Sequence, residues 1–267
     1  MAELPLVSVL FLTYNRAHTL IATYESFIRR VNYPRDRLEL ILCDDASEEW
    51  HRAIIDGLAF DKVVRADRNL GLGANQNAGV RAAGGDYILT LQDDCMLTGD
   101  AGFLRRTVAA MESDPVISMV AYRERPELPI LDRRTSPAGL LLVYGTAPGA
   151  RGCGDYAYSD QPNMKRADFH HTVGWFREGV AMTVMELDFQ RRVAAEPSLV
   201  VAALTGPDPF AHIGESFSLN PAHARAKQRE RLYRLPLIGP TYRALRHSAR
   251  RLTDAITGPT RQSGENG

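Results

Sequence analysis

Polar side chains follow four short apolar runs of the chain, and each run is typical of a buried strand. These polar residues are Thr13, Tyr14, Asn15 and Arg16 after residues 6–12, Asp44 and Asp45 after residues 38–43, residues 67–69 after residues 62–65, and Gln92, Asp93 and Asp94 after residues 87–91. Ligands of open parallel sheets bind beyond the carboxyl ends of the strands, so we expect these side chains to share one crevice. If this crevice receives a diphosphate, a divalent cation must bridge the carboxylate and phosphate oxygens. The carboxylates therefore predict Mg²⁺ or Mn²⁺.

Segments with helical spacing lie between these runs, at residues 19–30, 48–58 and 74–83. The alternation of strands and helices predicts an α/β fold with a parallel sheet buried on both faces. A further helix ends before Asp114 and Pro115, an apolar run covers residues 116–122, and we expect loops and a short hairpin over residues 123–162. Helical spacing returns over residues 173–195, and residues 199–204 are expected to form a last strand.

The chain has 267 residues, of which 45% are hydrophobic and 24% charged, so it suffices for one large α/β domain or two small ones and is not typical of a disordered protein. Its formal net charge is zero, but residues 222–251 contain nine Arg or Lys and the single acidic residue Glu230. Apolar residues recur at helical spacing over residues 242–256, with arginines on the opposite arc. We therefore predict a basic amphipathic helix attached to an acidic body.

Three cysteines, Cys43, Cys95 and Cys153, show no metal-like spacing, and together with the absence of a signal peptide pattern they predict a cytoplasmic protein. No run of about eighteen uncharged apolar residues occurs, which excludes a membrane-spanning helix. The basic helix favours peripheral docking on the anionic inner face of a membrane, with a solvated helix or a contact in a homo-oligomer as alternatives. Nucleic acid is a less coherent partner for this segment.

Four ordered motifs carry a family resemblance: VSVLFLTYNR, LILCDDAS, RNLGLGANQNAGVRAAGGDYILTLQDD and MELDFQRR. Over residues 6–215 the chain resembles the family 2 inverting glycosyltransferases, which implies a GT-A fold with a Rossmann-like, mostly parallel sheet. The implied reaction moves a sugar from a nucleotide-diphosphate sugar to an acceptor hydroxyl or amine, in polysaccharide, glycolipid or natural-product synthesis. We divide the chain into a domain at residues 1–220, a basic helical tail at 221–256 and a disordered terminus at 257–267, with nucleotide-binding and acceptor-binding halves of the domain at 1–122 and 123–220.

The resemblance also implies roles for individual residues. It places the donor nucleotide and sugar against Thr13, Tyr14, Asn15, Arg16, Asp44, Asp45, Asn69, Gly71, Gly73, Asn77, Gln92 and Asp93. Asp44 or Asp45 would read a base edge, although Asp45 could instead cap the following helix. Asp94 would ligate the divalent cation and His212 would complete its site, although a lone histidine is usually structural. Gln92 replaces the first carboxylate of the family's DxD motif.

The general base of the reaction is assigned by the same resemblance to Glu186, where the family pattern has Asp. Asp188 is the second choice, with a structural ion pair to Arg192 as the alternative. Trp175 could contact the acceptor, although Trp is more often part of a core. The departures at Gln92 and Glu186 keep open a degenerate donor-binding or scaffold subunit. A nucleotidyltransferase is less favoured, because TYNRAHT lacks that class's Gly-rich loop.

Overall fold

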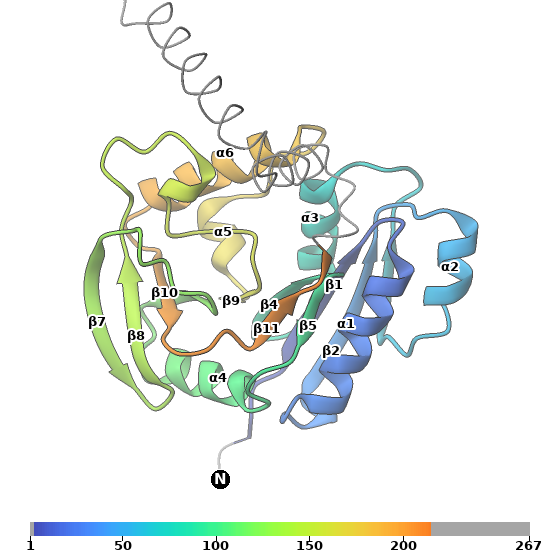
Figure 1. The fold of residues 1–267 in the computed structure, drawn as a ribbon, viewed down its shortest axis with the longest axis horizontal. Coiled ribbons are helices and arrows are strands. Elements are labelled where there is room, and N and C mark those ends of the chain that lie inside the picture. Colours follow the sequence, from blue (N-terminus) through green and yellow to red (C-terminus); the bar gives the residue numbers. More distant parts are fainter. Residues whose placement is uncertain (1–2, 215–267) are drawn as a thin grey trace, which may run out of the picture. The chain divides into compact units, whose positions relative to one another are not determined.

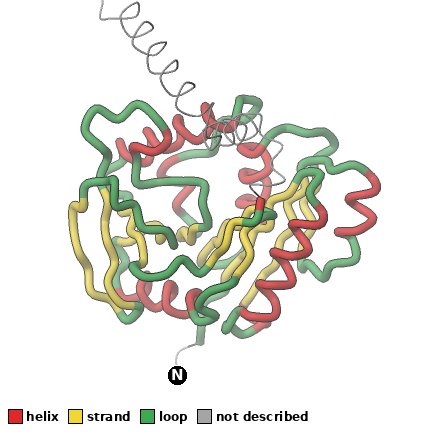
Figure 2. Tube along the Cα trace, in the orientation of Figure 1, coloured by secondary structure: helices red, strands yellow, loops and turns green. Residues whose placement is uncertain are grey.

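A central sheet lies between two layers of helices in the computed structural model, which describes residues 3–214 (Figures 1 and 2). The strands are β1 (Val7–Thr13), β2 (Leu38–Asp44), β3 (Lys62–Arg65), β4 (Tyr87–Gln92), β5 (Cys95–Leu97), β6 (Ile117–Ala121), β7 (Ile130–Ser136), β8 (Gly139–Tyr144), β9 (Asn163–Arg166), β10 (Val200–Leu204) and β11 (Phe210–His212). The helices are α1 (Ala17–Arg30), α2 (Glu49–Ile55), α3 (Leu72–Ala82), α4 (Phe103–Ser113), α5 (Phe169–Val173) and α6 (Met182–Ala195), with short 3₁₀ turns η1 (Arg35–Arg37) and η2 (Cys153–Asp155).

The nine-stranded sheet has the order β3-β2-β1-β4-β9-β6-β10-β8-β7, and β5 pairs with β11 in a separate ribbon. The first four strands are parallel to one another, which confirms the prediction for this half of the sheet. Their register aligns Thr13 with Asp44, Asp44 with Arg65, and Leu12 with Gln92. The polar residues that follow these strands therefore emerge at one edge of the sheet.

Alternation along β1 explains how both faces of the sheet are covered. Val7, Val9 and Phe11 pack in the core that α1, α2 and α4 close, whereas Leu10 and Leu12 face α3. A further core, which includes Met119 of β6 and Phe189 of α6, fills the space below α5 and α6. The buried strands and the helices on both faces confirm the predicted α/β fold class (Figure 2).

Strand β9 was not predicted, and it makes the sheet mixed because it runs antiparallel to both β4 and β6. Its sequence, NMKR, carries two basic residues and gives no apolar run. Lys165 is nevertheless completely buried in the centre of the sheet. The predicted hairpin in the middle of the chain is confirmed as β7 and β8. The strand predicted over residues 199–204 is confirmed as β10, but it is not the last one, because β11 follows it.

Two predictions about secondary structure were wrong in detail. The helix expected over residues 173–195 begins only at Met182, because residues 174–181 are not helical and Gly174 and Gly179 adopt positive φ values of 84° and 67° there. Strand β3 is not buried on both faces: it lies at the edge of the sheet, where Val63 is 53% exposed.

No helix within residues 3–214 is long and apolar enough to cross a membrane. The predicted basic tail at 221–256 and terminus at 257–267 lie outside the described residues.

Candidate active site

The loops after β1 and β2 hold each other in place. Asn15, at a positive φ of 53°, donates its backbone N–H to Ser47 Oγ at 2.8 Å. Its side-chain Oδ1 accepts the backbone N–H of Glu48 at 2.7 Å. Asn is among the residues that adopt this left-handed conformation most readily. Asn15 therefore sets the shape of the crevice edge, in addition to its predicted role toward the donor.

Asp44 and Asp45 point to different partners. Asp44 is completely buried, and its carboxylate accepts hydrogen bonds from Arg65 Nε and the Ser47 backbone N–H, both at 2.9 Å. Asp45 accepts the backbone N–H groups of Leu70 and Gly71, both at 2.8 Å. Helix α2 has Glu48 as its N-cap, so the capping alternative for Asp45 is wrong. Asp45 instead fixes the loop that leads into α3.

Two cavities adjoin the carboxyl edge of the sheet. One, of about 320 Å³, lies beside the ends of β2 and β3 and is lined by Ala46, Ser47, Arg52, Arg65, Ala66 and Asp67. The other, of about 630 Å³, lies in the second half of the chain; its lining includes residues 122–127, Ser159, Gln161, Gly206 and Asp208. The crevice edge thus has space on both sides of β4.

Helix α3 is tied to the sheet and to the segment before α6 by asparagines. Asn75 donates from Nδ2 to the Cys43 carbonyl at 2.9 Å, at the end of β2. Asn77 is fully buried and exchanges two hydrogen bonds with the Phe176 backbone, each at 2.9 Å. It also donates to Glu178 Oε1 at 2.7 Å. The structure thus gives Asn77, predicted to bind the donor, a contact that positions residues 176–178.

Close packing explains one of the two glycines predicted to approach the nucleotide. A Cβ at Gly73 would lie 2.6 Å from the Arg177 carbonyl oxygen and 3.0 Å from Met185 Cγ. Gly71 has a φ of 88° and precedes α3, where Asn69 Oδ1 also accepts its N–H at 3.1 Å. Gly73 therefore permits contact between α3 and the second half of the domain, and Gly71 permits the turn.

The carboxylates after β4 are buried and share one arginine. Arg16 Nη1 lies 2.9 Å from Asp93 Oδ1, and Arg16 Nη2 lies 2.7 Å from Asp94 Oδ2. Asp93 also accepts the Thr13 hydroxyl at 2.8 Å. Burial, opposed by Arg16, raises the pKa of Asp93 to about 7. This arrangement joins the ends of β1 and β4 into one charged centre, as the sequence predicted.

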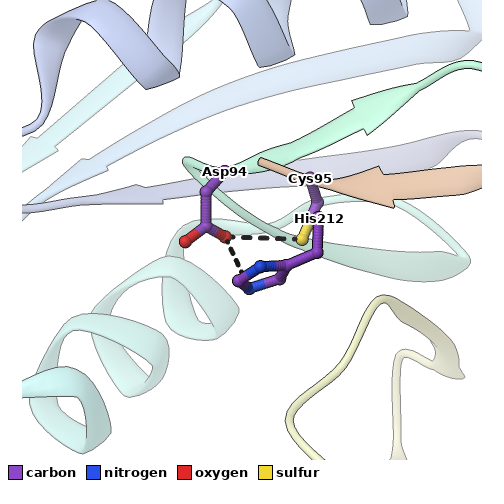
Figure 3. Close-up of side chains that lie close together, drawn as sticks. All are labelled: Asp94, Cys95 and His212. Atoms are coloured by element: carbon purple, nitrogen blue, oxygen red, sulfur yellow. Dashed lines mark hydrogen bonds and ion pairs between the residues drawn. The ribbon is translucent and has the colours of Figure 1, made fainter. Parts of the chain in front are cut away.

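Asp94 has a second set of neighbours, which Figure 3 shows. His212 Nε2 lies 3.3 Å from Asp94 Oδ1, and the Cys95 Sγ lies 3.6 Å from the same oxygen. The ribbon of β5 and β11 brings these residues together, since Cys95 pairs with His212. Gly214 packs so closely that a Cβ there would lie 1.8 Å from Asp94 Oδ2.

The donor atoms at this point fit a divalent cation of the manganese type. A carboxylate oxygen of Asp94, the imidazole of His212 and the Cys95 sulfur lie within 4.8 Å of one another. Manganese accepts carboxylate and imidazole ligands. Burial raises the pKa of the Cys95 thiol, and this thiol donates a hydrogen bond to Asp94 Oδ1 at 3.6 Å. Asp94 and His212 are then the two residues of this set that could ligate such a cation.

Glu186 lies in the second half of the site, on α6, and is held by the segment before β9. Its Oε1 accepts the Asp160 backbone N–H at 3.3 Å and the Gln190 side-chain N–H at 3.4 Å. Cys153 also contacts it. Burial and then the Asp160 carboxylate raise the pKa of Glu186 to about 7. A carboxylate with such a pKa is suited to accept a proton near neutral pH.

Asp188 and Trp175 have structural contacts. Arg192 donates from Nε and Nη2 to Asp188 Oδ2 at 3.0 and 2.8 Å, and binds the Val173 and Trp175 carbonyls at 2.7 and 2.9 Å. These contacts agree with the ion-pair interpretation of Asp188. The Trp175 ring stacks on His170, and the Arg81 guanidinium carbon lies 4.4 Å from the centroid of the Trp175 ring. Trp175 is 37% exposed.

Several residues of the site escaped the sequence analysis. Asn75 lies inside the motif LGANQNAG, so its position in that motif could have drawn attention to it. Arg65 ends β3 and could have been predicted as a partner for an acidic strand end. Asp160 and Lys165 gave no signal, because they lie in a stretch read as loops and in the unpredicted strand β9.

Comparison with known proteins identifies the family to which the chain belongs. The Glycosyl transferase family 2 model matches residues 8–177. The chain belongs to glycosyltransferase family 2. The uncharacterized glycosyltransferase YwdF of Bacillus subtilis is 34% identical over 201 residues, which are 71% of this chain and 68% of that protein. A cellulose synthase 2 of Novacetimonas hansenii is 24% identical over 116 residues, which are 43% of this chain and only 7% of that relative's length.

Solved structures confirm the GT-A fold. TarS 1–349 of S. aureus in complex with UDP-GlcNAc superposes with a TM-score of 0.57 at 15% identity, covering 84% of this chain and 64% of the TarS 1–349 chain. The mannosyltransferase PcManGT of Pyrobaculum calidifontis, in complex with GDP-Man and Mn²⁺, superposes with a TM-score of 0.56 at 16% identity. The superposition covers 92% of this chain and 65% of the PcManGT chain. At these identities the likeness concerns the fold alone.

Proposed function

We propose that this family 2 chain transfers a sugar from a nucleotide-diphosphate sugar to an acceptor hydroxyl or amine, with inversion and with a divalent cation. The observation that carries the proposal is the position of Asp94, which is 4% exposed in its side chain and lies 3.3 Å from His212 at the carboxyl edge of the sheet. Asp93 and the loops after β1 and β2 surround the same edge. Ligands of open α/β sheets bind at such an edge.

The donor nucleotide occupies the crevice between the loops after β1, β2 and β3. The loop of Thr13 to Arg16, the pair Asp44 and Asp45, and the turn at Asn69 and Gly71 border this space in our assignment. The cavity of about 320 Å³ beside Asp67 supports it, and the glycine turn before α3 directs a helix N-terminus toward the crevice. The neighbouring structures hold UDP-GlcNAc and GDP-Man, which are donors of this class.

Asp94 and His212 would hold Mn²⁺ or Mg²⁺. When bound, the cation neutralises charge on the departing diphosphate. Arg16 bridges Asp93 and Asp94 and so balances their negative charge in the described structure. We assign Arg16 a second task, which is to contact a donor phosphate once Asp94 is engaged by the cation. Mn²⁺ in the solved structure of PcManGT supports this choice of cofactor.

Glu186 acts as the general base in this proposal. Its carboxylate takes the proton from the acceptor hydroxyl or amine while the acceptor atom attacks the anomeric carbon of the donor. The bond from that carbon to the diphosphate oxygen breaks on the opposite face, and the nucleoside diphosphate leaves. The raised pKa of Glu186, caused chiefly by burial, keeps the carboxylate basic enough for this step near neutral pH.

The acceptor would approach from the second half of the domain. The cavity of about 630 Å³ includes Ser159 and Gln161, which flank the Asp160 that contacts Glu186. Trp175 remains a predicted acceptor contact. Cytoplasmic location, peripheral membrane docking through residues 221–256 and homo-oligomer formation remain predictions from the sequence.

A panel of UDP-, GDP- and dTDP-sugars tests the proposal with the purified chain. We expect release of one nucleoside diphosphate, stimulated by Mn²⁺ and abolished by EDTA, and an acceptor screen with that donor should then give a product of inverted anomeric configuration by NMR. Binding of donors without turnover across the acceptor screen would favour a donor-binding subunit. Failure of all three nucleotide classes to bind in the presence of Mn²⁺ would contradict the assigned donor site.

A further inference from the structure

Gln92 and Glu186, the two positions at which the family resemblance implies a departure from the motifs, are linked through Asp160. Gln92 stands in place of a carboxylate, and its Nε2 donates to the Asp160 carbonyl at 3.1 Å. The backbone N–H of the same Asp160 donates to Glu186 Oε1 at 3.3 Å, and Glu186 stands in place of the family's Asp. A single peptide segment thus joins the strand end that carries the Asp93–Asp94 pair to the proposed base.

We propose that Asp160 is a positioning residue that couples Gln92 to Glu186, so that the two departures from the family pattern form one compensated unit. The inference rests on the proposed function, because it assigns Glu186 the role of base. The inference assigns a function to Asp160, which lies outside the four quoted motifs, and it explains why position 92 carries glutamine and not a carboxylate.

The Gln92 contact requires a hydrogen-bond donor, which the side-chain amide supplies. The Asp160 carbonyl is an acceptor, so its partner at position 92 must donate a hydrogen bond. A carboxylate at that position offers acceptors only, and it would leave the Asp160 carbonyl facing negative charge. The length of Glu186 is explained in the same way, since a shorter Asp side chain would withdraw its oxygens from the Asp160 N–H.

The segment that carries Asp160 is itself held firmly. Asp160 Oδ1 accepts the Tyr158 hydroxyl at 2.8 Å, and both residues are buried. Gln190 of α6 donates to the Tyr158 carbonyl at 2.8 Å and to Glu186 at 3.4 Å. Glu186 is therefore held to residues 158–160 in two ways: directly by the Asp160 N–H, and through Gln190 of its own helix.

Charged and titratable groups face this unit from several elements. Asp160 and Tyr158 precede β9, Cys153 of η2 contacts Glu186, and Arg125 lies on the loop after β6. Lys165 of β9 is completely buried and is the cation that acts on Asp160, with its Nζ 3.5 Å from Thr90 Oγ1. The Asp160 carboxylate opposes ionisation of Glu186, and Arg125 favours it.

A double-mutant cycle tests the coupling at saturating Mn²⁺ and donor. Gln92→Asp and Glu186→Asp each break the link, and we expect each to lower kcat about tenfold, in proportion to one lost hydrogen bond. Because both act through Asp160, the double variant should lose about tenfold as well, rather than about a hundredfold. Multiplicative losses would overturn the inference.

A second measurement does not depend on turnover. In protein labelled with ¹³C at glutamate carboxyls, with Glu186→Gln to assign the signal, Gln92→Met should shift the titration of Glu186 to higher pH, because the Asp160 N–H that favours the ionised carboxylate is no longer held in place. Asp168→Asn is the control that should leave the Glu186 titration unchanged, since Asp168 is exposed and its side chain makes no capping bond. An unchanged Glu186 titration in Gln92→Met would overturn the inference even if the chain proves inactive.

Discussion

Removal of Arg16 should destabilise the cation-free protein strongly. The Arg16 side chain is 16% exposed and contacts Asp93 and Asp94 at 2.9 and 2.7 Å, and these carboxylates are only 5% and 4% exposed in their side chains. Breaking a buried charge pair by deleting one partner costs roughly 3–5 kcal/mol. A chain of this size loses about 2–4 °C of Tm per kcal/mol, so Arg16→Ala should lower Tm by roughly 6–20 °C.

The assay is thermal unfolding by circular dichroism in EDTA, with Arg29→Ala as the matched control. Arg29 lies on the same helix and pairs with Glu25, but the side chains of that pair are 73% and 46% exposed. An exposed pair of this kind contributes less than about 0.5 kcal/mol, so the control should unfold within about 2 °C of wild type.

Manganese should then restore more stability to Arg16→Ala than to wild type, because Arg16 no longer competes for Asp94. At a hundred times the dissociation constant, a ligand of the folded state adds about 2.7 kcal/mol. The reasoning is refuted if Arg16→Ala unfolds with the Tm of the Arg29→Ala control in EDTA, or if Mn²⁺ raises the Tm of both proteins equally.

Three further perturbations have defined outcomes. With a Glu186 pKa of about 7, the ionised fraction and hence kcat should rise about tenfold from pH 6 to pH 8, and Glu186→Gln should remove this dependence together with transfer. Gly73→Ala should destabilise the fold by about 1–3 kcal/mol in urea unfolding because its Cβ would lie 2.6 Å from the Arg177 carbonyl, whereas Gly154→Ala meets nothing within 4 Å and should be nearly neutral. Burial lowers the pKa of Lys165 to about 8, below about 10.4 in the unfolded chain, so the unfolded state binds more protons between these values. The free energy of unfolding should therefore rise from pH 8 toward pH 10, and Lys165→Met should flatten this rise; a wild-type curve that falls over this range would contradict the assignment.

The first half of the domain could be predicted from the sequence because its strands are continuous apolar runs that end in polar residues. Asp44 follows such a run directly and Asp93 follows one after Gln92, and parallel pairing then brings their side chains to one edge. The motif residues around Gly71 were found for the same local reason, since a turn before a helix needs a residue that tolerates positive φ.

The second half could not be predicted in the same way, because its contacts join distant segments. Lys165 is polar in sequence but buried, and only the folded sheet supplies Asp160 and Thr90 as its neighbours. Asn77 was assigned to the donor from its motif, whereas its hydrogen bonds reach Phe176, ninety-nine residues away. Contacts between segments so far apart in the chain produce no periodic pattern of apolar residues in the sequence, so they could not be predicted from it.

The measurement that tests the central claim most directly is Mn²⁺-dependent release of nucleoside diphosphate from the preferred donor by wild type and by Asp94→Ala. We predict that Asp94→Ala loses at least about a hundredfold in rate and no longer responds to Mn²⁺, because the cation loses its carboxylate ligand. Asp100→Ala, which removes a carboxylate from an exposed pair with Arg106, should release nucleotide at the wild-type rate. Undiminished, Mn²⁺-stimulated release by Asp94→Ala would contradict the account.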